Sequence, residues 1–271
     1  MDLATLLGLG LMFLVVFFGM TYDVTTHTLT FDTIHLFLDI PALLIIVFGS
    51  FFSTMAAYPV SVVLDMGRIV GKLFFPPATP MVESLSLIVD LSKIARKNIL
   101  ALEDSLPNIA SPILRGGLRM VIDRMNREAI AEMLHAEVKY RELEAENEVG
   151  FFKMLSTIVP SFGLVGTLLG LIVLLQNLQD ASKIGPALSI AFVATFYGVF
   201  FSNAVYYPMF TKLAVIKNRQ RVFHEMIRDG ILMIEKGERP ELIEQVLLNY
   251  LTPSQKRLYE DLRFGAYSGN A

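Results

Sequence analysis

The fold of this chain is decided at residues 151–210, which read FFKMLSTIVPSFGLVGTLLGLIVLLQNLQDASKIGPALSIAFVATFYGVFFSNAVYYPMF. Two long apolar runs lie here, separated by a short polar link at residues 176–183. No Asp, Glu, Lys, Arg or His occurs at residues 154–179 or at residues 184–211. Each run is long enough to cross a bilayer core, which takes about 20 apolar residues. The stretch therefore predicts two membrane helices joined by a tight link.

Glycine and proline mark particular positions in these two runs. Gly166 and Gly170 are four residues apart, a small-residue spacing that lets a second helix approach closely. Pro160 and Pro208 have no amide proton, so each frees the carbonyl four residues before it. We interpret both prolines either as hinges that respond to a passing ion or as static kinks, which are common in membrane helices.

The composition is that of an integral membrane protein. Of the 271 residues, 54% are hydrophobic, and only 18% are charged, against about 25% in soluble domains. The mean hydropathy is +0.54. The net charge of −3 and the lack of a basic stripe with interleaved aromatics argue against nucleic-acid binding. There is no cysteine, which excludes disulfides and thiol nucleophiles. The first apolar run lacks the basic start of a cleaved signal peptide, so we expect it to remain as an anchor.

The distribution of basic residues predicts the topology. Nearly all Lys and Arg lie in 68–153 or 212–263, and Lys183 is the only one in an expected outer link. The positive-inside rule then places both polar segments and both termini in the cytoplasm. Two further membrane helices are expected at Leu3–Met20 and from Asp39 to about Leu64, the latter bent or broken near Pro59. We divide the chain into four regions. Residues 1–64 form two membrane helices with an outer link, and residues 65–150 form a cytoplasmic helical domain. Residues 151–211 form two more membrane helices, and residues 212–271 form cytoplasmic C-terminal helices with a tail.

The polar segments carry helical patterns, and we expect an all-α protein. Met81–Ser105 and Leu114–Glu148 have apolar residues at helical spacing, with a glycine pair, 116–117, interrupting the chain before the second. A helix from Arg219 to Lys236 is expected to end at Gly237, and the tail after Pro253 to be weakly ordered.

Several motifs resemble one family in the same order. These are PSFGLVGTLLGL at 160–171, IGPALSIA at 184–191, and TFYG, SN and P at 195–208, with MDLATLLG at the start and ARK…LALE at 95–103. Together they are similar to the MotA/PomA type of flagellar stator A subunit over most of the chain. Two departures stand out. Many members have Asp-Pro where this chain has Asp180-Ala181, and sodium-type members often have two threonines where it has Ala194-Thr195.

The third and fourth apolar helices have no acid deep within them, so the chain either does not conduct ions or needs a partner that supplies the acid. The resemblance implies the second case. It implies a single-span B subunit with a membrane aspartate and a peptidoglycan-binding domain, five A subunits around two B subunits, and a rotor switch protein as the second partner. It further implies a bacterial inner-membrane protein of flagellar rotation and chemotaxis that transports Na⁺ or H⁺ and has no cofactor.

Thr167 and Thr195 are the candidate ion ligands. Sodium is a hard cation and favours oxygen ligands such as hydroxyls and freed carbonyls. The resemblance associates threonines at these positions with sodium coupling, so Thr167 favours sodium over the proton. Gly166, Pro160 and Pro208 are assigned to the same pathway. The alternative is that each threonine bonds to the carbonyl four residues before it and only packs.

Three charged residues complete the candidate set. Asp39 precedes Ile-Pro, a pattern typical of an N-cap, and we favour that role over gathering cations at a pore mouth. Arg96 and Glu103 lie in ARKNILALED, where charges on a helix are most often a solvated face. The resemblance implies that they contact the rotor, although the gap between them is one residue shorter than in close members.

Other functions were weighed against this hypothesis. An enzyme is disfavoured because the four histidines are scattered and no paired membrane acids or phosphate-binding loop occur. A TolQ/ExbB-like energiser of a periplasmic partner remains an alternative, although that family usually has three spans. A non-conducting membrane scaffold is the other, and it predicts that Thr167→Ala is neutral.

Overall fold

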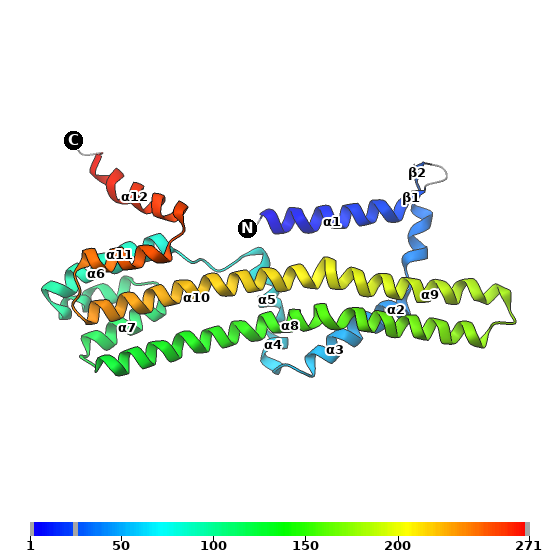
Figure 1. The fold of residues 1–271 in the computed structure, drawn as a ribbon, viewed down its shortest axis with the longest axis horizontal. Coiled ribbons are helices and arrows are strands. Elements are labelled where there is room, and N and C mark those ends of the chain that lie inside the picture. Colours follow the sequence, from blue (N-terminus) through cyan, green and yellow to red (C-terminus); the bar gives the residue numbers. More distant parts are fainter. Residues whose placement is uncertain (1–2, 24–26, 269–271) are drawn as a thin grey trace. The chain divides into compact units, whose positions relative to one another are not determined.

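The computed structural model describes residues 3–23 and 27–268, most of which lie in helices (Figure 1). The chain forms two compact units. The first, here called the membrane unit, is Met1–Pro77 with Ala145–Ile216. The second, the polar unit, is Ala78–Glu144 with Lys217–Ala271. The chain passes from one unit to the other at Pro77–Ala78, within the long helix α8 (Arg127–Gln176) and within the long helix α10 (Tyr207–Glu235).

The membrane unit begins with a long apolar helix and a small hairpin, and its second apolar segment is built from short pieces. Besides parts of α8 and α10, its elements are α1 (Leu3–Thr21), β1 (Tyr22–Asp23), β2 (Thr28–Leu29), the 3-10 helix η1 (Phe31–Phe37), α2 (Ile40–Leu44), the π-helical η2 (Ile45–Gly49), α3 (Ser50–Met55), α4 (Val60–Leu64), α5 (Met66–Phe74), α9 (Ala181–Phe200) and the π-helical η4 (Phe201–Tyr206). The hairpin pairs Tyr22 with Leu29 and Asp23 with Thr28, antiparallel. The sequence predicted only a polar link there.

Among residues 3–23 and 27–268, three helices are long and apolar enough to cross a membrane, namely Leu3–Thr21, the apolar part of Arg127–Gln176, and the helix that starts at Ala181. A fourth apolar helix, Ile40–Met55, is shorter. At 1.5 Å per residue it extends about 24 Å, somewhat less than the roughly 30 Å hydrocarbon core. Its end agrees with the break expected near Pro59, where 3-10-type hydrogen bonds at Ala57 and Tyr58 close the last turn. The expectation of an all-α membrane protein is confirmed.

The second apolar helix packs against α8 and α9 at small residues. A Cβ added at Gly49 would lie 2.6 Å from the Phe162 ring, so the glycine leaves room for that side chain. Ala42 and Ile46 belong to the same buried cluster as Val193 of α9. These contacts pack the second apolar helix against the α8–α9 pair.

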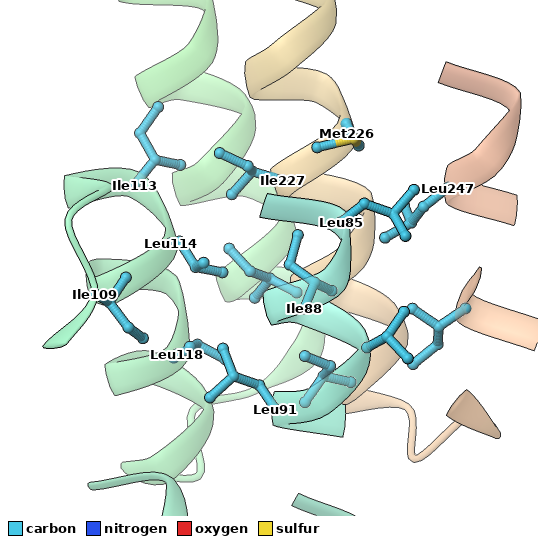
Figure 2. Packing of buried hydrophobic residues seen from close by; sticks show 14 of the residues in the cluster. Leu85, Ile88, Leu91, Ile109, Ile113, Leu114, Leu118, Met226, Ile227 and Leu247 are labelled. Atoms are coloured by element: carbon cyan, nitrogen blue, oxygen red, sulfur yellow. The ribbon is translucent and has the colours of Figure 1, made fainter. Parts of the chain in front are cut away.

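The polar unit is a helical bundle with its own core. Its remaining elements are α6 (Met81–Lys97), the 3-10 helix η3 (Ile99–Asn108), α7 (Pro112–Ile122), α11 (Pro240–Leu247), the 3-10 helix η5 (Leu248–Tyr250) and α12 (Pro253–Ser268). Figure 2 shows leucine and isoleucine side chains from α6 and α7 meeting Met226 and Ile227 of α10 and Leu247 of α11. A Cβ at Gly117 would lie 2.5 Å from Ile231, so α7 approaches α10 closely.

Some helix limits in this unit differ from the expectation. The helix expected to reach Ser105 ends at Lys97, because Asn98 is extended and caps η3 by accepting from the Leu100 amide at 3.1 Å. The expected interruption at residues 116–117 is wrong, since both glycines lie inside α7. The break falls instead after Ile122, at Arg124 with its φ of 52°. Neither break carries a glycine or proline that would have marked it.

The C-terminal part is more ordered than expected. Gly237 has a φ of +72°, its amide bonds to Ile234, and the next amide bonds to Met233, which is the expected glycine stop of α10. After it, Tyr250 donates to Asp229, and Tyr259 donates to Glu244 at 2.9 Å. The tail predicted to be weakly ordered forms α12 as far as Ser268.

Candidate functional site

Thr167 of α8 and Thr195 of α9 face each other directly. Their hydroxyl oxygens are 2.6 Å apart. Thr167 Oγ1 also lies 3.0 Å from the Gly163 carbonyl oxygen and 3.2 Å from that of Ala191, which is 3.2 Å from Thr195 Oγ1 as well. Each threonine hydroxyl therefore lies within hydrogen-bond distance of a carbonyl of its own helix, as the packing interpretation predicted, and also of the other hydroxyl across the helix pair.

This cluster has more acceptor capacity than it has protons. It brings together two hydroxyl and two carbonyl oxygens, while each hydroxyl carries only one proton to donate. Thr167 is partly exposed and Thr195 is exposed in the single chain. An oxygen-rich cluster with an open side is chemically suited to a hard cation.

The two helices can meet this closely because the contact is lined with glycine and alanine. A Cβ at Gly163 would lie 2.9 Å from the Gly198 Cα, and one at Gly170 would lie 2.9 Å from the Ala191 amide nitrogen. A Cβ at Gly166 would lie 2.7 Å from the Ala194 Cβ. Gly166 thus acts as the spacing predicted, and α9 is the helix that approaches it (Figure 1).

Pro160 lies within α8, and the carbonyl that it frees has a partner. The hydroxyl of Ser202 donates to the Ser156 carbonyl oxygen at 2.6 Å. Ser202 belongs to η4, the π-helical turn that continues α9, and is only 5% exposed. The freed carbonyl follows from the sequence, whereas its donor, 46 residues away, does not.

Pro208 lies at the start of α10, next to the wide helical turn η4. The Tyr207 amide bonds to the Ser202 carbonyl five residues before it, the π-helical pattern that ends just ahead of the proline. Pro208 lines an apolar cavity of about 610 Å³ between α1 and the start of α10. The structure places it away from the threonine pair, on the α1 side of the unit.

Asp39 caps α2, as favoured from the sequence. Its carboxylate accepts from the Ala42 amide at 2.7 Å. The segment before α2 is tied to α9 by Tyr197, whose hydroxyl donates to the Phe37 carbonyl and lies 3.3 Å from the Asp39 amide that donates to it. Tyr197 therefore adds a polar contact between α9 and this segment to the packing of its ring.

Known proteins resemble this chain over almost its whole length. Residues 105–226 match the model of the MotA/TolQ/ExbB proton channel family. Motility protein A of Borreliella burgdorferi is 32% identical over 259 residues, covering 94% of this chain and 96% of that protein. Chemotaxis protein PomA of Vibrio alginolyticus is 30% identical over 262 residues, covering 96% of this chain and all of that protein.

The chain belongs to the MotA/PomA family of flagellar stator A subunits.

Solved structures agree with this family. The flagellar MotAB stator complex of Bacillus subtilis matches with a TM-score of 0.80 and 27% identity, over 93% of this chain and 97% of that chain. The C. jejuni MotAB structure matches in fold with a TM-score of 0.83. Full-length similarity to motility A proteins supports the stator over the TolQ/ExbB-like alternative.

The two departures from the MotA/PomA pattern have structural explanations. Asp180 caps α9 by accepting from the amide of Ser182 at 3.1 Å, which leaves Ala181 at the first helical position, where alanine and proline are both suitable. Ala194 is fully buried against Gly166 in the α8–α9 contact. It is therefore a packing position, whereas Thr195, one residue on, is the one beside Thr167.

The rotor residues expected from the MotA/PomA resemblance lie in the polar unit. Arg96 is exposed in the last turn of α6, and Glu103 is exposed in η3, beyond the Asn98 break. Among the described residues neither forms an ion pair. Because α6 ends between Arg96 and Glu103, the two charges do not lie on one continuous helix.

Proposed function

We propose that this stator A subunit forms, together with a B subunit, a cation channel whose coupling ion is sodium, and that ion flow generates torque on the rotor. The observation that carries the proposal is the Thr167–Thr195 pair, whose hydroxyls lie 2.6 Å apart beside two backbone carbonyls. It supplies oxygen ligands where the apolar helices offer no charge.

The missing charge defines the partner. Residues 154–179 and 184–211 of the two central apolar runs contain no acidic side chain, while ion pathways through membranes usually need one. The exposed side of Thr195 leaves the oxygen cluster open to a second chain. A B subunit that carries a membrane aspartate would complete the ligand set there, and the MotAB complexes among the solved relatives support such a partner. The resemblance adds five A subunits around two B subunits in the bacterial inner membrane, and the positive-inside rule places both termini in the cytoplasm.

Torque requires a contact with the rotor. Arg96 and Glu103 are exposed and free of ion pairs within the described chain, so they are available to charges on a rotor switch protein. Movement at the α8–α9 pair would reach them through the ring of A subunits.

The test is rotation speed with this protein and its B subunit as the only stator, across sodium concentrations at constant membrane potential and pH. Rotation should rise with sodium in the wild type, and Thr167→Ala should abolish it or raise the sodium requirement strongly. Thr167→Ser keeps the hydroxyl and should retain most of the speed.

A matched control is available in the same helix. Within the part of the chain that the structure describes, Thr157 bonds to the Lys153 carbonyl alone, at 3.0 Å, and makes no bond to α9. Thr157→Ala should therefore rotate as the wild type does. If rotation does not depend on the sodium concentration, the assignment as a stator stands and the coupling ion is the proton, which is the ion named in the family's description. Absence of ion conduction by the wild-type complex, with no effect of Thr167→Ala, would favour the non-conducting scaffold alternative.

A further inference from the structure

Ser202 compensates for the hydrogen bond that Pro160 removes. Residue 160 has no amide proton, so the Ser156 carbonyl loses the helical donor it would otherwise have. Water is scarce in a bilayer core, and an unsatisfied carbonyl there costs free energy. The Ser202 hydroxyl occupies that place at 2.6 Å and is itself almost completely buried.

Ser202 also shapes its own helix. Its carbonyl accepts from the Tyr207 amide five residues on, which is part of the π-helical turn η4. Its side chain thus bonds to α8, while its backbone forms the wide turn before Pro208. One residue connects both proline positions.

The contact between Ser202 and the threonine pair is made by backbone and small side chains. A Cβ at Gly198 would lie 2.9 Å from the Gly163 Cα and 3.4 Å from the Pro160 Cα. The Gly163 carbonyl in turn accepts from Thr167 at 3.0 Å. No long side chain at these positions can adjust to absorb a shift, so a slip of α8 along α9 at Ser202 would be passed to the threonines.

We propose that Ser202 is a positioning residue for ion transfer. Its bond to the Ser156 carbonyl holds α8 and α9 in the register that brings Thr167 and Thr195 together. The identity of the ion rests on the proposed function, whereas the positioning role does not.

The first test is the sodium dependence of rotation in the stator complex. Ser202→Ala should raise the half-saturating sodium concentration about threefold to tenfold, the range that one lost hydrogen bond supplies, with a smaller change in maximal speed. Ser202→Thr retains a hydroxyl and should restore the wild-type value. Ser156→Ala is the matched control, because it removes only a side chain bonded to Lys153 at 2.7 Å and leaves the Ser156 carbonyl in place. An unchanged half-saturating concentration in Ser202→Ala, or an equal shift in Ser156→Ala, would overturn the proposal.

The second test does not depend on the ion. Pro160→Ala returns an amide proton that can bond to the Ser156 carbonyl, so Ser202 should then matter less. In thermal unfolding of the purified complex, Ser202→Ala should lower the midpoint by less than half as much in the Pro160→Ala background as in the wild type. Equal shifts in both backgrounds would contradict the positioning role. If wild-type rotation proves indifferent to sodium, the sodium proposal fails, the half-saturating proton concentration replaces that of sodium, and this cycle still decides the role of Ser202.

Discussion

At the scale of single residues, the α8–α9 contact depends on the absence of side chains. Gly166→Ala places a Cβ 2.7 Å from the Ala194 Cβ, and both atoms belong to rigid helices. We expect a loss of about 1–3 kcal/mol of stability, typical of overpacking, and a non-functional motor. Gly185→Ala is the control, because a Cβ there has open space. Thermal unfolding of the purified complex measures both, and equal stability of the two variants would contradict this account of the contact.

Tyr197 makes the second prediction at this scale. Tyr197→Phe keeps the ring but removes the hydroxyl that bonds to Phe37 and Asp39. The net loss should be about 1 kcal/mol, the usual contribution of a hydrogen bond, seen as a lower unfolding midpoint. Tyr207, which is 55% exposed, provides the matched Tyr→Phe control. A silent Tyr197→Phe would show that ring packing alone joins α9 to the segment before α2.

The sequence could indicate which residues matter more readily than which atoms meet. Thr167, Thr195 and Gly166 were identified from chemistry and resemblance. Their contact, however, depends on the register between helices, which no local pattern encodes. Pro160 allows a freed carbonyl, that of Ser156, to be deduced from the sequence. That Ser202 is its donor depends on the register between the helices and on the π turn, which has no compositional signature here.

At the scale of secondary structure elements, an ion pair attaches α5 to α8. Lys72 Nζ lies 2.5 Å from Glu148 Oε2, with side chains 24% and 11% exposed. Lys72→Met or Glu148→Gln should cost about 1–3 kcal/mol, because the remaining charge stays largely desolvated. The charge-exchanged double variant should recover part of this loss. Lys93→Met, which removes an exposed pair with Asp90, should change the unfolding midpoint little. Similar losses in all the single variants would argue against a special role for the α5–α8 pair.

His224 of α10, which interacts with charges on α8, predicts how the stability of the polar unit responds to acid. Burial, together with the Arg141 guanidinium, lowers the pKa of His224 below its ordinary value of 6.5, with Glu137 acting in the opposite direction. The folded state therefore favours neutral His224. Its stabilising effect is complete above about pH 6.5 and is lost as the pH falls toward the lowered pKa, because the unfolded chain binds the proton first. Unfolding midpoints of the complex between pH 5.5 and 8 should fall on the acid side, and less so in His224→Gln. Exposed His135→Gln is the control, and an identical acid response in His224→Gln would reject the assignment.

Helix ends in the polar unit show why local patterns are insufficient at this scale. Gly237 was expected to stop α10 because glycine readily adopts a positive φ, and it does so at +72°. Arg124 ends its turn with a positive φ that arginine rarely adopts, so tertiary packing rather than composition determines that break.

At the scale of the whole molecule, the chain divides its chemistry between two units. The membrane unit contributes hydroxyls and carbonyls but no acid at residues 154–179 and 184–211, so the proposed ion transfer needs another chain. The polar unit has its own apolar core and exposes charges. This division fits a protein that receives energy in one unit and delivers force from the other.

The rotor contact is the prediction that belongs to this scale. Arg96 and Glu103 are exposed, and each exposed pair contributes only about 0.2–1 kcal/mol, so neutralising one of them should reduce torque at high load without abolishing rotation. Reversing both charges should turn attraction into repulsion and stop rotation, and charge reversal on the rotor should restore it. Lys139→Glu reverses an exposed charge on α8 and serves as the control. Bead rotation at several loads measures torque directly. Because the two charges lie on either side of the Asn98 break, rescue by a rotor variant should depend on which charge is reversed, and rescue that ignores position would mean that only net charge matters.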